Sequence, residues 1–265
     1  MKIDVIIGLY KEPKYITQCL KSLPRKTEGY ELNTILVEDN SPYSSQLKLH
    51  TSLLGHENYL SLPDPTGEDI ETFVRQLTEK SMDIGFVPMA SFYRSHQTKH
   101  FGLIHSDADV VCFSDEDVFF PEDFFPKIHQ LFSKYENIIV FGNLHRWKQK
   151  EDYKWQVFEE QEDWSTLDNI KRKNNESMCD CVFAVRRDLM IRSGGYPNFI
   201  GYGADKEVAI RQLVKEGGFL TLFKDLKYYH IEHEKFHYLM ENNVSDIYPE
   251  LYNTELPVNN LIEIK

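Results

Sequence analysis

The chain has 265 residues, 41% of them hydrophobic and 13% aromatic, which is enough to bury the core of one large α/β domain. Its formal net charge of −12 at pH 7 excludes a general attraction to phosphate polymers, although it is compatible with a local basic groove. The four cysteines are too few and too scattered for a disulfide framework, the first residues lack a signal-peptide pattern, and no apolar run approaches the roughly 20 residues that cross a bilayer. We therefore predict a cytoplasmic protein with free thiols and no transmembrane segment.

Apolar runs alternate with amphipathic segments through the first half of the chain, beginning with a buried strand at 3–10. Pro13 opens a helix with one apolar stripe, and residues 33–42 hold a strand that runs into an acidic turn. The further expected strands are 57–62, 109–114 and 137–144, and the further expected helices are 66–80, roughly 88–106 and one that begins at Pro121. This alternation predicts a doubly wound α/β fold with a mostly parallel central sheet and flanking helices.

Three polar motifs, "YKEP", "EDNSP" and "SDED", directly follow expected strands of this sheet. In open α/β sheets, ligands bind at the carboxyl ends of the strands. The sequence therefore predicts a ligand site at the edge where these motifs meet.

The second half is less regular. Residues 145–178 are polar, contain all three tryptophans and show no sustained period, which is typical of a long functional or mobile excursion. A strand, a short helix and a glycine turn then lead to a helix at 205–218 and to two strand-like runs, 219–223 and 226–234. The last thirty or so residues, 236–265, form a tail with weak signals.

The acidic triplet Asp115, Glu116 and Asp117 follows the strand at 109–114 directly. In an acidic protein, such a triplet can be a solvated strand end. Asp115 and Asp117, however, are two residues apart, so a turn can aim both carboxylates at one point. Mg²⁺ and Mn²⁺ prefer oxygen ligands and commonly take one or two carboxylates together with substrate phosphates. The triplet therefore indicates a site for a metal and a diphosphate.

Four segments in order resemble the inverting nucleotide-sugar glycosyltransferases of family two, which have the GT-A fold. They are "VIIGLYKEPKYITQCLKSL", "ILVEDNSP", "VVCFSDEDVFFPEDF" and "RRDLMIRSGGYPNFIGYGADKEVAIRQLVKEGG". The third is similar to the family's "FLDxDD" metal motif. The resemblance covers about residues 1–235, and it implies a single GT-A (Rossmann-like) domain with a nucleotide-sugar-binding half at 1–120 and a smaller acceptor half at 121–235.

The resemblance implies a role for each matching residue. Asp205 is the general base, with Glu207 as the alternative, because the family's usual Glu-Asp pair is replaced by Ala204-Asp205. The implied contacts to the nucleotide sugar come from Tyr10, Glu12, Glu38, Asp39, Arg94, Asp115 and Glu116. The implied ligands of Mn²⁺ or Mg²⁺ are Asp117, Asp115, His230 and His233. The implied acceptor-binding residues are Trp147, Trp155 and Trp164.

Several of these residues also have a plain structural interpretation. Asp39 can cap its turn, and Asp205 can cap the helix that follows it. His230 and His233 fall on opposite faces of a strand, so at most one of them is expected to bind the metal. The tryptophans can form a satellite core under a long loop. His96 and His100 stand four residues apart without an intervening acid, which favours a solvated helix face over a zinc site.

The implied reaction is transfer of a sugar from a nucleoside diphosphate, favoured to be UDP, to an acceptor hydroxyl. A divalent cation would stabilise the leaving diphosphate, and one base without a carboxylate nucleophile predicts inversion. A saccharide is the expected acceptor, and a hydroxymethylated base in DNA is the alternative, near local positive charge in "NIKRKNN" and "VRRDLMIRS". A nucleotidyltransferase is disfavoured because no glycine-rich basic loop follows the first strand. A binding module without transferase activity is disfavoured because both metal carboxylates are present.

Overall fold

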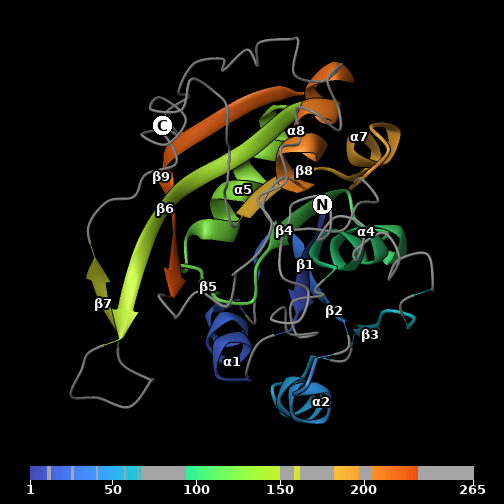
Figure 1. Ribbon diagram of the computed structural model, residues 1–265. Coiled ribbons are helices and arrows are strands. Elements are labelled where there is room, and N and C mark those ends of the chain that lie inside the picture. The colour runs from blue at the N-terminus through green and yellow to red at the C-terminus, as the bar shows by residue number, and fades with distance from the viewer. Residues whose placement is uncertain are drawn as a thin grey trace, which may run out of the picture.

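The computed structural model describes residues 1–10, 13–24, 27–39, 41–56, 58–64, 66, 94–149, 158–161, 182–196 and 205–231 (Figure 1). The strands are β1 (Lys2–Leu9), β2 (Glu31–Glu38), β3 (Tyr59–Ser61), β4 (Val110–Ser114), β5 (Val118–Phe119), β6 (Ile138–Gln149), β7 (Phe158–Gln161), β8 (Val182–Arg186) and β9 (Phe219–Ile231). The helices are α1 (Pro13–Ser22), α2 (Ser44–Leu53), α4 (Ser95–His105), α5 (Phe124–Lys134), α7 (Arg187–Arg192) and α8 (Asp205–Lys215).

The strands form one sheet in the order β3-β2-β1-β4-β8-β6-β9-β5, with β7 paired to β6 outside this path. Pairing is parallel from β3 through β4 and again between β6 and β9, whereas β8 runs antiparallel to both of its neighbours. The long strands β6 and β9 run side by side along one flank of the molecule (Figure 1). The predicted mixed α/β fold with flanking helices is therefore confirmed.

Helices cover both faces of the sheet, because the central strands are apolar on both sides. In β1, Ile3 and Val5 belong to one buried cluster and Ile6 to the other. The first cluster includes side chains from α1, α2 and α5, and the second includes side chains from α4, α7 and α8. The strands end at the edge of the sheet that lies between these two layers of helices.

Two helices start later than the sequence indicates. The structure has α4 from Ser95 rather than from about 88, and residues 88–93 lie outside the described part. Similarly, α5 begins at Phe124, because Pro121 forms a turn in which its carbonyl accepts the Phe124 amide at 3.0 Å. The predicted helix at 66–80, apart from Thr66, and the tail at 236–265 also lie outside the described residues.

The two runs expected at 219–223 and 226–234 are one strand, β9, which bulges where its register with β6 shifts between Phe141 and Asn143. Gly142 lies at the bulge, where an added Cβ would come 2.4 Å from the Leu226 carbonyl oxygen. Only glycine lets the two backbones approach this closely.

Three further elements are not anticipated by the sequence patterns. The structure contains α2 and the two-residue strand β5, and β6 continues past Leu144 to pair with β7. The start of the irregular segment at 145–178 is therefore regular after all. The division into halves at residue 120 stays a prediction.

Two findings bear on composition. Cys19 and Cys112 are buried free thiols, while Cys179 and Cys181 lie outside the described residues. Among the described helices, none is both long and apolar enough to cross a bilayer.

Candidate functional site

The three polar motifs meet at one edge of the sheet. Strands β2, β1 and β4 are neighbours and parallel, so their carboxyl ends point the same way. Asp39 follows β2, Tyr10 follows β1, and Asp115 follows β4. The predicted ligand edge therefore exists, and the residues that form it follow three different strands.

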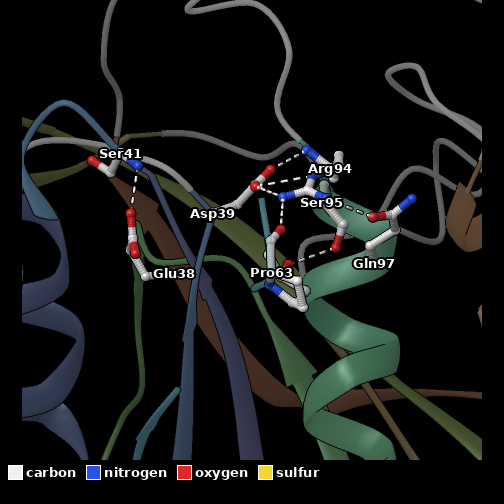
Figure 2. A network of polar contacts seen from close by, with 8 residues as sticks. Glu38, Asp39, Ser41, Pro63, Arg94, Ser95 and Gln97 are labelled. Atoms are coloured by element: carbon white, nitrogen blue, oxygen red, sulfur yellow. Dashed lines mark hydrogen bonds and ion pairs between the residues drawn. The ribbon is translucent and has the colours of Figure 1, made fainter. Parts of the chain in front are cut away.

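Asp39 is bound by Arg94, which directly precedes α4 (Figure 2). The Asp39 Oδ1 atom accepts hydrogen bonds from Arg94 Nε at 3.0 Å and Nη2 at 2.6 Å, and Oδ2 accepts the Arg94 backbone N–H at 2.7 Å. Both side chains are buried, with 1% of Asp39 and 3% of Arg94 exposed. Such charge-assisted contacts hold the carboxylate in one orientation.

Arg94 also joins Asp39 to two neighbouring elements. Its Nη2 donates to the Pro63 carbonyl at 2.9 Å, and its Nη1 donates to Gln97 Oε1 at 3.3 Å (Figure 2). Pro63 lies just after β3 and Gln97 lies in α4. The arginine thus ties the ends of β2 and β3 to the start of α4.

Glu38 and Glu116 are hydrogen-bonded to the backbone of the polar turns. Glu38 Oε1 accepts the Ser41 N–H at 2.5 Å (Figure 2), and both oxygens of Glu116 accept the Tyr10 N–H, at 3.1 and 3.2 Å. The Ser41 hydroxyl donates to the Tyr10 carbonyl at 2.7 Å. These contacts shape the turns after β1 and β2, while a direct contact of either glutamate with a nucleotide stays a prediction.

Tyr10 stands half-buried beside Asp39. Burial raises the pKa of the Tyr10 phenol to about 12, and the Asp39 carboxylate contributes to this increase. The phenol is therefore protonated at neutral pH and can donate a hydrogen bond.

Asp115 pairs with Lys99, a residue of α4 that the sequence analysis did not single out. The Lys99 Nζ lies 2.7 Å from Asp115 Oδ1 and 6.0 Å from the centre of the Tyr196 ring. Only 1% of the Lys99 side chain is exposed, compared with 31% of Asp115. One signal for it exists in the sequence: His96, Lys99 and Leu103 follow helical spacing, and all three are buried.

Asp117 lies against His230, which β9 brings to the end of the site. The His230 Nε2 atom is 3.3 Å from Asp117 Oδ2, and the Ile231 N–H donates to the Asp117 carbonyl at 2.8 Å. The ladder between β5 and β9 creates this contact by pairing Val118 with His230. Asp117 is 1% exposed and His230 is 25% exposed.

The Asp117–His230 pair fits Mn²⁺ or Mg²⁺ in its chemistry, since it offers one carboxylate and one imidazole. Within the described part of the chain, no three His, Cys, Asp or Glu side chains gather as a metal-binding group. Asp115 as a further ligand stays a prediction, and other ligands can come from the substrate or from residues outside that part. His233 is one such residue.

Cys19 lies beneath the acidic triplet. Burial raises the pKa of its thiol well above the usual range, and the charges of Asp117 and Glu116 add to this. The thiol thus stays protonated at neutral pH.

His96 and His100 do not form a solvated face, so that prediction is wrong. His96 is fully buried, and His100 packs against Gly195, where an added Cβ would come 2.6 Å from its Nδ1 atom. Burial also lowers the pKa of His100. The turn at Gly195 covers the side of α4 that the sequence alone leaves open.

The remaining predicted residues are only partly placed. Asp205 and Glu207 lie in the first turn of α8 and Trp147 lies in β6, but for these three the structure describes the backbone only. Glu12, Trp155 and Trp164 lie outside the described residues.

The model of the family described as "Glycosyl transferase family 2" matches residues 64–194. No curated protein matches the chain. Among solved structures, TarS 1–349 from S. aureus in complex with UDP-GlcNAc is 16% identical, with a TM-score of 0.58 over 89% of this chain and 60% of that chain. The same TarS fragment in complex with UDP is 14% identical, with a TM-score of 0.55 over 88% and 61%. A longer S. aureus TarS chain is 14% identical, with a TM-score of 0.57 over 88% and 37%. This chain thus spans less than two thirds of each, and at these identities the likeness concerns the fold.

Proposed function

The chain belongs to glycosyl transferase family 2 and has the GT-A fold, and on this premise we propose that it transfers a sugar from a nucleoside diphosphate to an acceptor hydroxyl. The observation that carries the proposal is the row of acids at one sheet edge, each with a different partner: Asp39 with Arg94, Asp115 with Lys99, and Asp117 with His230. UDP is the proposed nucleotide, and the TarS structures with UDP and UDP-GlcNAc support this choice.

The strand order suggests how the nucleotide lies. Asp39 stands two strands away from Asp115, which at the usual strand spacing is about 10 Å and comparable to the length of a nucleoside. We place the base beside Tyr10 and Asp39, the ribose at Asp115, and the diphosphate toward Asp117. In this arrangement the protonated phenol of Tyr10 can donate to a base carbonyl.

A divalent cation, Mn²⁺ or Mg²⁺, is part of the proposal, with Asp117 and His230 as the residues that would hold it. When bound, such an ion supplies positive charge to the departing diphosphate. The protein contributes the fixed positions of the two ligands, which the β5–β9 ladder determines.

Asp205 is the proposed general base, with Glu207 as the alternative, and both lie in the first turn of α8. As the acceptor oxygen bonds to the anomeric carbon, the bond from that carbon to the phosphate oxygen breaks, and the acceptor proton passes to the carboxylate. A single displacement of this kind inverts the anomeric centre. NMR of the product would contradict it if an α-donor gave an α-linked product.

A saccharide is the proposed acceptor, because the net charge of −12 disfavours DNA. The residues proposed to contact it are the three tryptophans Trp147, Trp155 and Trp164. A cytoplasmic location stays a prediction.

The first test is calorimetric titration of UDP into the protein with and without Mn²⁺. We expect metal-dependent binding that Asp117→Asn abolishes. Asp188→Asn is the matched control, because Asp188 is an exposed carboxylate on α7 that forms its salt bridge with Arg192 of the same helix. A protein that binds no nucleoside diphosphate in a metal-dependent way would contradict the donor site and leave the binding-module interpretation in its place.

A further inference from the structure

We propose that Lys99 is a positioning residue that holds Asp115 for the ribose of the donor and thereby sets a preference for ribonucleotides. The inference rests on the proposed function, since it assumes a nucleoside diphosphate at this edge. Its direct basis is the contact of 2.7 Å between Lys99 Nζ and Asp115 Oδ1.

The burial of Lys99 requires a structural or functional reason. A lysine is almost never fully buried unless it is paired, because removing an ammonium group from water is costly. Here the side chain rises from α4 between the sheet edge and the ring of Tyr196, which is itself 3% exposed. Such a site holds the ammonium group in place, so the carboxylate that it contacts is held as well.

The difference in exposure assigns the two roles. Lys99 is 1% exposed and cannot reach a ligand in solution, whereas Asp115 is 31% exposed at the edge where the strands end. The acid is therefore the member that meets the nucleotide, and the lysine acts through it. A lysine that contacted the diphosphate directly would need to be the more exposed of the two.

Arg94 and Asp39 repeat this arrangement five residues earlier in the chain. Arg94 directly precedes α4 and is a buried cation bound to the acid after β2, just as Lys99 is a buried cation bound to the acid after β4. Helix α4 and the residue directly before it thus fix two acids that stand on either side of Tyr10 (Figure 2 shows the Arg94 end). This geometry suits a ligand that presents hydrogen-bonding groups at both points, as a base and a ribose do.

The test compares the affinities for UDP and for 2′,3′-dideoxy-UDP, both with Mn²⁺, by calorimetry. The wild type should bind UDP about tenfold more tightly, which is the effect of one hydrogen bond to a charged group. Lys99→Met should reduce that ratio to about threefold or less, because the released carboxylate no longer faces the ribose. Lys99→Arg should restore most of the ratio.

Two controls separate positioning from folding. Thr98→Val removes the bond from the buried Thr98 hydroxyl to the Ser95 carbonyl, so it loosens α4 without changing charge, and it should keep the wild-type ratio. Adding Lys99→Met to Asp115→Asn should not change the ratio further, because the lysine acts through that acid. The double variant removes both charges together, so it also serves if Lys99→Met alone fails to fold.

Each other outcome overturns the inference. Equal losses of affinity for both nucleotides in Lys99→Met would mean a direct phosphate contact or a general defect. An unchanged ratio in Lys99→Met, or no ribose preference in the wild type, would refute the role of Lys99 while leaving UDP binding intact. A wild type that binds neither nucleotide refutes the proposed function itself.

Discussion

Replacing Arg94 by methionine should destabilise the protein strongly. The substitution keeps most of the buried stem but removes the two guanidinium bonds to Asp39 and the one to the Pro63 carbonyl. Asp39, 1% exposed, would then be a buried carboxylate that, among the described residues, keeps only the bond from the backbone N–H at position 94. Removing one partner of a buried ion pair typically costs about 3–5 kcal/mol, because the other charge is left uncompensated.

Urea unfolding followed by circular dichroism measures this cost. The control is Arg192→Met, since Arg192 pairs with Asp188 on the surface of α7, with 53% and 69% of the two side chains exposed. An exposed pair four residues apart on a helix contributes only about 0.3–0.5 kcal/mol. Both substitutions remove a guanidinium group, so the difference between their losses in free energy of unfolding measures the effect of burial.

A double variant separates the pair from other effects of the substitution. In Arg94→Met/Asp39→Asn the buried charge is gone, so this variant should be more stable than Arg94→Met alone. A loss below about 1 kcal/mol for Arg94→Met, close to that of the Arg192→Met control, would refute the reasoning.

Two further predictions concern the core. Gly195→Ala should lower the melting temperature more than Gly194→Ala. Gly195 and Gly194 have left-handed φ angles of 72° and 94°, which cost alanine about 1–2 kcal/mol at either position. Only at position 195 would the added methyl group also press on His100. The stability should also fall as the pH rises from about 8 to 10, because burial raises the thiol pKa values of Cys19 and Cys112, so the unfolded chain releases these protons first. The free energy of unfolding obtained from urea titrations across this range should fall by up to about 1.4 kcal/mol per pH unit for each thiol, and the Cys19→Ala/Cys112→Ala variant should lack that part of the slope.

The fold could be predicted wherever burial determines the residue pattern. Strands β1, β2 and β4 are covered on both faces, so each contains an apolar run, and α1 keeps one apolar stripe because only one side meets the sheet. The continuity of β9 could not be predicted, since its bulge interrupts the apolar run and is compensated by Gly142 on the partner strand. This compensation depends on the pairing of β6 with β9, two segments that are far apart in the sequence.

The acids of the candidate site could be predicted from the sequence, but their pairing with Arg94, Lys99 and His230 could not. The motifs place Asp39, Asp115 and Asp117 at strand ends, which local patterns identify. Lys99 was missed because a lysine in a helix is usually solvated, and its burial arises only when the turn at Tyr196 covers α4. His230 was predicted by resemblance, and the β5–β9 ladder provides the physical reason for its position.

The partners of the acids also indicate where an external cation would bind. The two glutamates of the edge accept backbone N–H groups, and Asp39 and Asp115 each face a buried arginine or lysine. An arginine or lysine cation that already holds a carboxylate opposes a second cation there by charge repulsion. Asp117 instead faces His230, and an imidazole can lose its proton and bind a metal through nitrogen. Of the acids at this edge that the structure describes, Asp117 is therefore the one whose partner can share a metal ion with it, which is why Asp117→Asn should abolish the metal dependence of UDP binding.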